Sequence, residues 1–258
     1  MGVKIAIRIR EFYFLFMSTY GDRMEIFMNK KFLTNYFSLG EKLLWLFSIL
    51  LIAISYIVFD SSNYLALIAS LIGVTALIFC AKANPFGQLL MIIFGMVYGY
   101  ISFTFKYYGE MITYVGMTVP MAFVSLFSWL KNSYNGSKSE TLIRNIKKKD
   151  ILKLVILTAV VTVVFYFILS LFTTANLIPS TISVATSFFA ASLTFLRSEY
   201  YALAYAANDI ILIILWILAS IVDISYLSVI ICFIVFLIND LYGFFNWQRI
   251  KKKQAGTN

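Results

Sequence analysis

Histidine is absent from the 258-residue chain, and cysteine occurs only twice. Without histidine, catalytic sites of the Ser-His-Asp or Cys-His kind cannot be assembled, and the usual zinc sites lose one of their main ligands. Cys80 and Cys232 both lie inside apolar runs, so no disulfide framework is expected. An integral-membrane enzyme would need clustered acids, and the loop 131–150 offers only Glu140 and Asp150 among bases. We therefore expect neither an enzyme nor a bound metal or cofactor.

Charge is also scarce, since charged residues make up 13% of the chain and hydrophobic residues 61%. A soluble domain has about twice that charged fraction, so a soluble enzyme and a disordered scaffold are both excluded. The apolar runs are long and continuous, which favours membrane-spanning helices over the alternating strands of a barrel. We predict eight spans, over residues 43–59, 64–80, 86–104, 111–129, 151–172, 179–196, 200–220 and 226–247.

The basic residues predict the orientation of these spans. With residue 1 inside, twenty of the 21 Lys and Arg residues fall in inner segments, and only Lys106 falls outside. Because cytoplasmic loops carry an excess of Lys and Arg, both termini are expected in the cytoplasm, in a multi-pass protein of the inner (plasma) membrane. The net charge of +9 then reports orientation in the lipid bilayer, and no nucleic-acid partner is expected.

The chain divides into seven predicted regions. Residues 1–42 are expected to form a basic amphipathic segment on the inner leaflet, because their apolar stretch is too short for a cleavable signal. Met1 and Met24 are both open as the natural start. The other regions are an extra transmembrane helix (43–59), a first three-helix repeat (64–129), a basic loop (130–150), a linker helix (151–172), a second three-helix repeat (179–247) and a basic tail (248–258).

The two repeats end alike. Trp129 is followed by Lys131, and Trp247 is followed by Arg249. Two three-helix groups joined by one helix must share an orientation, and parallel repeats of this kind place a transport site at their interface near the bilayer midplane. The alternative is that tryptophan and a base simply mark any inner interface. The fold class we predict is an all-α integral membrane protein of two parallel three-helix bundles, a linker helix and an extra N-terminal span.

Two acids, Asp209 and Asp240, lie inside predicted spans, and no Lys or Arg lies within the spans to pair with them, since Lys153 stands at the inner end of the span 151–172. Ionisable residues inside a membrane are costly and are functional candidates by default. We expect them to line a wet cavity, to be protonated or to share hydrogen bonds with other polar groups.

Other polar residues share faces with these acids. At about 100° per residue, five side chains of span seven fall on one flank, and spans three and eight carry similar faces. Aromatic rings, amides and a carboxylate suit a flat, polyhydroxylated ligand, although helix–helix hydrogen bonding would use the same residues. The candidate substrate-binding residues are Gln88, Tyr98, Tyr201, Tyr205, Asn208, Asp209, Trp216, Asn239, Asp240 and Tyr242.

With these residues in place, the chain resembles the PnuC vitamin transporters, which are related in fold to SWEET sugar transporters. The resemblance covers residues 40–250 and rests on the segments 84–88 and 107–110, the two Trp-plus-base endings and the face of span seven. The family pattern there is W-x3-Y-x3-N-x6-W, and this chain has Tyr201, Tyr205, Asp209 and Trp216 at those spacings. Two positions depart from it, Tyr for Trp and Asp for Asn.

The resemblance implies uptake of nicotinamide riboside by facilitated diffusion, with the substrate trapped by an intracellular kinase as a step toward NAD biosynthesis. It also implies a homotrimer, with Tyr201, Tyr205, Asp209 and Trp216 holding the ligand opposite Gln88. The departures leave alternatives open, namely another vitamin or nucleoside (thiamine, riboflavin or a deoxynucleoside) or proton-coupled transport through Asp209 or Asp240.

Overall fold

The computed structural model describes residues 36–104, 108–174 and 176–256, so the predictions for residues 1–35 and for Lys106 lie outside the described residues. The described residues form eight helical segments long and apolar enough to cross a membrane. The all-α fold class is therefore confirmed. These segments are α3 (Leu39–Phe59), α4 (Tyr64–Ala81), α5 (Phe86–Thr104), the continuous run α6 (Tyr108–Thr113), η1 (Tyr114–Thr118) and α7 (Val119–Lys131), then α8 (Lys148–Leu171), α9 (Leu177–Phe195), α10 (Tyr201–Ser220) and α11 (Leu227–Ala255), the last preceded by the short η2 (Ile224–Tyr226).

The chain divides into two compact units, residues 1–44 and 45–258. In the first unit, the described residues open α3 with a reciprocal cap: the Ser38 amide donates to Glu41 Oε2 (2.6 Å), and the Glu41 amide donates to Ser38 Oγ (3.3 Å). This cap satisfies two of the amide groups that the first turn of a helix leaves without partners. Every helix from α4 onward belongs to the second unit.

Six helices of the second unit form a closed ring. Going round it, α4 packs against α5, α5 against α7, α7 against α9, α9 against α10, α10 against α11, and α11 against α4. The first three helices come from the first predicted repeat and the last three from the second. The two contacts that join the bundles are equivalent, because in each the first helix of one bundle meets the last helix of the other.

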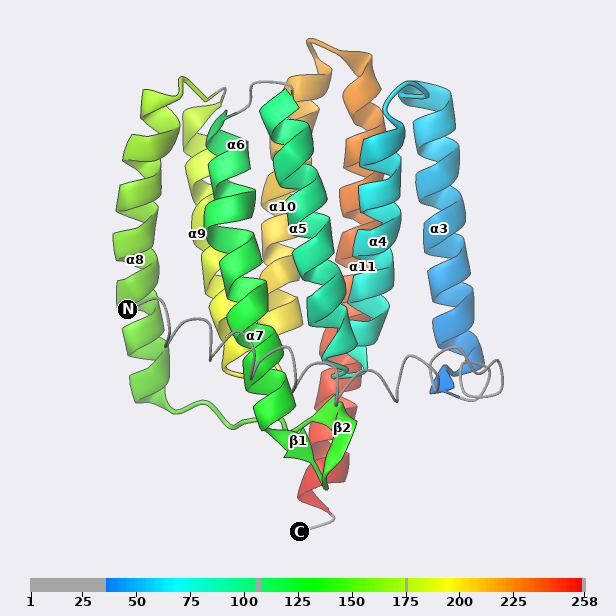
Figure 1. Cartoon of the computed structure of the whole chain (residues 1–258), viewed down its shortest axis with the longest axis vertical. Coiled ribbons are helices and arrows are strands. Elements are labelled where there is room, and N and C mark those ends of the chain that lie inside the picture. The colour runs from blue at the N-terminus through cyan, green and yellow to red at the C-terminus, as the bar shows by residue number, and fades with distance from the viewer. Residues whose placement is uncertain (1–35, 105–107, 175, 257–258) are drawn as a thin grey trace, which may run out of the picture. The chain divides into compact units, whose positions relative to one another are not determined.

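Two further helices lie outside this ring. The linker helix α8 packs along α9, as Figure 1 shows at one edge of the bundle. The α3 residues of this unit reach α4 and α11: the Trp45 indole donates to Thr75 Oγ1 (3.2 Å), and Ser48 Oγ accepts from Asn239 Nδ2 (2.9 Å). Most of the exposed side chains of α8 are apolar, as expected for a helix that faces lipid.

The two repeats are related residue by residue at their ends. The Trp247 indole donates to the Cys80 carbonyl at the end of α4, and the Trp129 indole donates to the Thr194 carbonyl at the end of α9, both at 2.8 Å. Both tryptophans are 0% exposed, with ring centroids 5.3 Å apart. They are therefore cross-bundle contacts rather than the interfacial anchors that their position next to a base predicted.

The helix ends that accept these bonds are also alike. After α4 and after α9, one residue adopts a left-handed conformation, Ala83 at φ 56° and Arg197 at φ 57°. In both turns the amide of the next residue returns to a carbonyl of the last helical turn, at 3.1 Å from Asn84 to Phe79 and at 3.0 Å from Ser198 to Leu193. This is the common way to satisfy orphan carbonyls at a helix C-terminus. The match supports an internal repeat over the alternative that the sequence left open.

A cap covers the end of the ring that carries Lys82, Lys131 and Arg197, which we call the basic end. It is a β-hairpin, β1 (Ser133–Tyr134) and β2 (Ser137–Thr141), turned by Asn135 and Gly136 with positive φ values of 47° and 70°. Asn-Gly is the usual sequence of such a turn. In Figure 1 the hairpin lies beside the C-terminal part of α11.

The predicted basic tail is helical up to Ala255, because α11 continues past the membrane-spanning segment. Gln254 on this extension anchors the cap: its Oε1 accepts from the Ile143 amide (2.9 Å), and its Nε2 donates to the Thr141 carbonyl (3.1 Å). Arg197 holds the same loop by donating from Nε to the Leu142 carbonyl (3.0 Å). Partial burial, together with the nearby Arg144 charge, lowers the pKa of Arg197 below its usual range.

Candidate substrate-binding site

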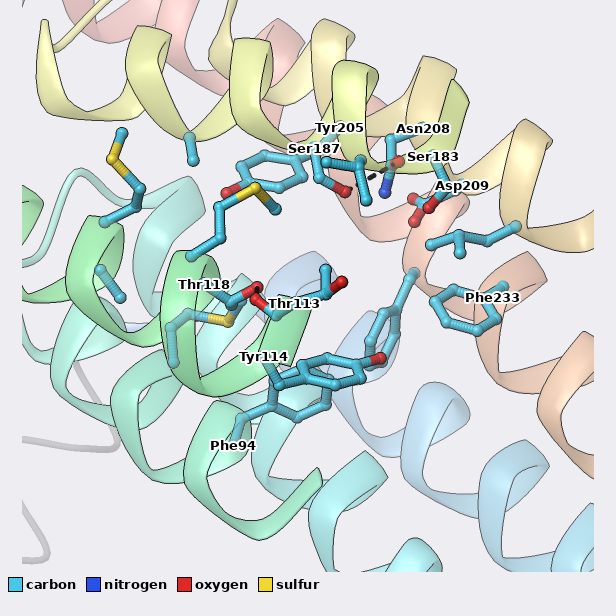
Figure 2. Close-up of a pocket in the computed structure, with 18 of the residues that line it drawn as sticks. Phe94, Thr113, Tyr114, Thr118, Ser183, Ser187, Tyr205, Asn208, Asp209 and Phe233 are labelled. Atoms are coloured by element: carbon cyan, nitrogen blue, oxygen red, sulfur yellow. Dashed lines mark hydrogen bonds between the residues drawn. The ribbon is translucent and has the colours of Figure 1, made fainter. Parts of the chain in front are cut away.

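A central cavity of about 150 Å³ lies inside the ring (Figure 2). On this measure it has room for on the order of ten water molecules, which is space for a small solute rather than for one bridging water. Side chains from all six ring helices line it. Of the ten predicted substrate-binding residues, seven line the cavity: Gln88, Tyr201, Tyr205, Asn208, Asp209, Trp216 and Asp240.

The helix α10 supplies one wall of the cavity. Tyr201, Tyr205, Asn208, Asp209 and Trp216 all face it, as their helical spacing predicted. Tyr201 lies at the basic end, and Trp216 lies about four turns further along at the opposite end. The wall therefore offers aromatic rings at both ends, with an amide and a carboxyl group between them.

Neighbouring hydroxyl groups fix the orientation of Asn208. Its side-chain carbonyl accepts hydrogen bonds from Thr186 Oγ1 (2.7 Å) and Ser187 Oγ (3.0 Å), both on α9. Figure 2 shows Ser187 and Ser183 beside Asn208 on this wall. The Ser/Thr-rich run of α9 therefore lines the cavity and positions a candidate binding residue.

The two acids inside the spans meet in the cavity. Asp209 and Asp240 are each 4% exposed, and both line the cavity where α10 packs against α11. Asp209 Oδ2 has no hydrogen-bond partner among the described residues. Their place in a shared cavity agrees with one of the three environments expected from the sequence, namely a cavity.

The opposite wall contains a turn of π-helix, η1, between α6 and α7. It begins at Tyr114, and Thr113, Tyr114 and Thr118 line the cavity (Figure 2). Pro120, the second residue of α7, has no N–H to donate to the preceding turn, which accounts for the local break from α-helical bonding. Sequence periodicity did not select these residues, because a π turn shifts the register of the face; Pro120 was the only signal.

The basic end of the cavity is closed by aromatic rings. Tyr201 lines the cavity and also packs edge-on against Trp247, with centroids 4.6 Å apart, and the Trp129 ring lies 6.2 Å from Tyr201. All three side chains are buried. The route from the cavity to the basic end is therefore blocked in this conformation.

A second cavity, of about 640 Å³, lies toward the opposite end and shares Glu110, Tyr114 and Trp216 with the first. Asp60 and Asp223, from the loops at that end, also line it. Partial burial raises the pKa of the Asp60 carboxyl above its usual value, whereas the Ser225 amide lowers the pKa of the exposed Asp223. Each acid that the sequence places on the outer side therefore borders this vestibule (a cavity leading to the central one).

Three of the predicted residues lie elsewhere. Tyr98 lines the vestibule, where its hydroxyl is hydrogen-bonded to Ser70 Oγ (3.1 Å) and its ring stacks on Tyr114. Asn239 is turned toward α3, where its amide donates to Ser48. Tyr242 is half-buried on α11 and lines neither cavity.

Comparison with known proteins places this architecture in a family. The family model described as nicotinamide mononucleotide transporter matches residues 63–249, which contain every residue that lines the central cavity. The chain belongs to this family. It is thus a multi-pass membrane transporter of the inner (plasma) membrane and not an enzyme.

Individual relatives agree with this assignment. A nicotinamide riboside transporter PnuC of Neisseria mucosa is 30% identical over 219 residues, which are 82% of each chain, and a second one, of Haemophilus influenzae, is 24% identical and covers 82% of this chain and 91% of its own length. The crystal structure of a vitamin B3 transporter PnuC superposes with a TM-score of 0.72 at 25% identity, over 84% of this chain and 94% of that one. The predicted membership of the PnuC transporters is therefore confirmed.

Proposed function

We propose that this transporter carries nicotinamide riboside across the inner membrane by facilitated diffusion. The observation that carries the proposal is the central cavity, whose lining combines aromatic rings, side-chain amides and carboxyl groups. No Lys or Arg is found among the described residues that line it. The named substrate of the two similar transporters supports the same conclusion.

The chemistry of nicotinamide riboside matches the two kinds of side chain that line the cavity, aromatic rings and hydrogen-bonding groups. Its nicotinamide ring is flat and, when N-ribosylated, positively charged, so Tyr201, Tyr205 and Trp216 offer faces on which it can stack. Its ribose hydroxyls and carboxamide need donors and acceptors, which Asn208 and Asp209 supply from α10 and Asp240 supplies from α11.

Gln88 serves as the partner from the opposite bundle in this proposal. Its Nε2 donates only to Cys80 Sγ (3.2 Å), and a thiol is a weak acceptor. The amide can therefore turn to a ligand carboxamide at small cost. Trp216, which borders both cavities, is placed to cover the substrate on the vestibule side.

Transport requires that the closed basic end opens while the vestibule side closes. We propose that the two bundles move relative to each other about the α4–α11 and α7–α9 contacts. The indole bonds of Trp129 and Trp247 join one bundle to the other, so they are the bonds that must break. The basic end corresponds to the cytoplasmic side, with both termini there, because the basic residues gather at it.

A passive carrier for a cationic nucleoside needs a further step that retains the transported substrate inside the cell. We propose that an intracellular kinase phosphorylates the substrate, which adds negative charge and feeds NAD biosynthesis. We also propose that the protein assembles as a homotrimer, as the resemblance to the PnuC transporters implies.

Uptake into proteoliposomes tests the function. With purified protein and radiolabelled nicotinamide riboside, internal and external concentrations should become equal without any imposed ion gradient. Enclosing a nicotinamide riboside kinase and ATP should convert equilibration into accumulation. Trp216→Ala should slow uptake, whereas Trp45→Ala, a matched change outside both cavities, should not. Accumulation without kinase and ATP would contradict facilitated diffusion.

One observation favours a second candidate, proton-coupled transport, namely the buried acids Asp209 and Asp240 in the cavity. Under that mechanism, Asp240→Asn would abolish concentrative uptake while leaving substrate exchange intact. Tyr201 and Asp209, where the family pattern has Trp and Asn, likewise keep thiamine, riboflavin and deoxynucleosides as alternative substrates.

A further inference from the structure

The Asp209–Asp240 pair has a property that the proposed stacking of a ligand does not use. Its two carboxyl groups, each 4% exposed, line one cavity where α10 packs against α11, and two buried carboxylates that share a site do not both stay ionised. At least one proton therefore resides on the pair in the empty protein. Asp209 Oδ2, in a side chain 4% exposed, has no partner among the described residues and borders the cavity (Figure 2).

No protein cation balances this pair from the described parts of the surrounding helices. The titratable groups that line the same cavity come from α4, the α6–η1 run, α10 and α11, and each of them is neutral or acidic. Among the described lining residues, α5, α7 and α9 contribute no titratable group. Besides the two acids, these groups are Cys80, Glu110, Tyr114, Tyr201 and Tyr205. Cys232, on α11, is a further thiol close to Asp209. Positive charge at the pair must then come from a proton or from a ligand.

The side-chain carbonyl of the neighbouring Asn208 is not the acceptor that a ligand would use. The Asn208 side-chain carbonyl already accepts from Thr186 and Ser187, which ties it to α9. The free oxygen of Asp209 is thus the acceptor on this wall that is left for a ligand.

We infer that the Asp209–Asp240 pair is a binding site for an organic monocation, at which the charge of the substrate replaces the proton of the empty pair. The inference rests on the proposed function for the identity of the substrate, a ribosylated pyridinium. One substrate cation enters and one proton leaves to water in the cavity, so the net charge of the site is unchanged. Over a full transport cycle this exchange is the proton-coupled mechanism that the buried acids favour, and it still equalises nicotinamide riboside across a membrane that has no pH gradient. Exchange at constant charge therefore adds no further buried charge to the site when the substrate binds.

The inference predicts a linkage between binding and pH. Where the empty pair holds its proton and the occupied pair does not, the apparent affinity rises about tenfold for each unit of pH increase. A neutral ligand of the same shape has no charge to exchange, so its affinity stays constant over that range.

Isothermal titration calorimetry of the full-length purified protein tests this directly. Nicotinamide riboside is titrated at one pH in buffers of different ionisation enthalpy, such as phosphate and Tris, and the slope of the binding enthalpy gives the protons released. We expect close to one proton per substrate. Dihydronicotinamide riboside, which keeps the ribose and carboxamide but has no charge, should bind with no proton released.

Matched variants assign the proton to the pair. In Asp240→Asn the amide can donate to a permanently ionised Asp209, so nicotinamide riboside should bind with release near zero; Asp209→Asn gives the reciprocal test. Asp150→Asn, an acid paired with Arg144 outside the cavity, should keep a release of one proton.

The outcomes separate this inference from the proposed function. Binding of nicotinamide riboside with no proton released, or with equal release in the wild type and in Asp240→Asn, would overturn the exchange and leave the proposed function standing. Equal proton release by the charged and the neutral compound would also overturn it, without recourse to any variant. Absence of binding by both compounds would overturn the proposed function and the inference together.

Discussion

Replacing Trp247 by phenylalanine removes one of the two indole bonds that close the basic end. The bond to the Cys80 carbonyl is 2.8 Å long and fully buried, but that carbonyl also accepts from the Ala83 amide (2.9 Å), so it keeps one partner. We therefore assign about 1 kcal/mol to the lost bond. The smaller ring leaves a void beside Trp129 and Tyr201, which adds about 1–2 kcal/mol.

The total of about 2–3 kcal/mol corresponds to a fall of about 4–12 °C in the unfolding temperature of a protein of this size. Thermal unfolding in detergent, followed by size-exclusion chromatography, measures it. The internal repeat predicts an equal fall for Trp129→Phe, because the Thr194 carbonyl also keeps a second donor, the Arg197 amide (3.0 Å). Trp45→Phe is the control, since its indole bond is long (3.2 Å) and exposed, and it should change stability by less than about 0.5 kcal/mol. The role assigned to the indole bond is refuted if Trp247→Phe has the unfolding temperature of the wild type. It is also refuted if Trp45→Phe lowers the unfolding temperature as much as Trp247→Phe does.

Three further changes probe the binding wall, the helix packing and the cap. Trp216→Ala should weaken binding of nicotinamide riboside by about 1–3 kcal/mol, the loss expected for one stacking ring, and unchanged affinity by calorimetry would remove Trp216 from the site. Gly87→Ala should cost about 1–3 kcal/mol of stability, because its Cβ would lie 2.7 Å from the Cys80 backbone nitrogen, whereas Gly40→Ala, with no atom within 4 Å, should not lower the unfolding temperature. Gln254→Ala leaves two buried backbone groups of the cap without partners, so trypsin should cleave faster after Arg144; an unchanged cleavage rate would show that the cap does not depend on Gln254.

The spans and the α10 wall were predictable because each depends on a property of one segment. A run of apolar residues must be helical in a membrane whatever surrounds it. The spacing of Tyr201, Tyr205 and Asp209 places them on one side of a helix, and the polar side of a membrane helix turns away from lipid.

Which neighbour a polar face meets depends on the packing of several helices. Asn239 and Asp240 are adjacent in the sequence, yet Asp240 faces the cavity and Asn239 faces Ser48 on α3. A helical wheel gives their directions about the axis but not the position of α3 outside the ring. Tyr98 lies on the predicted face of α5, but near the vestibule end of that helix, so it borders the second cavity.

Two local features had sequence signals of different strength. Asn135-Gly136 between short polar segments is a good hairpin signal, which the basic character of the loop obscured. The π turn at Tyr114 had only Pro120 as a signal, because one extra residue in a turn leaves the apolar run of the span unchanged.

Binding of nicotinamide riboside in the central cavity can be tested through ligand-dependent thermal stability. The purified protein is heated with nicotinamide riboside, thiamine, riboflavin or a deoxynucleoside. A ligand present at 100 times its Kd stabilises the folded state by about 2.7 kcal/mol, which raises the unfolding temperature by about 5–10 °C. We predict this rise for nicotinamide riboside and a smaller rise in Trp216→Ala at the same concentration. No rise with nicotinamide riboside, together with a rise for one of the other three compounds, would contradict the proposed substrate.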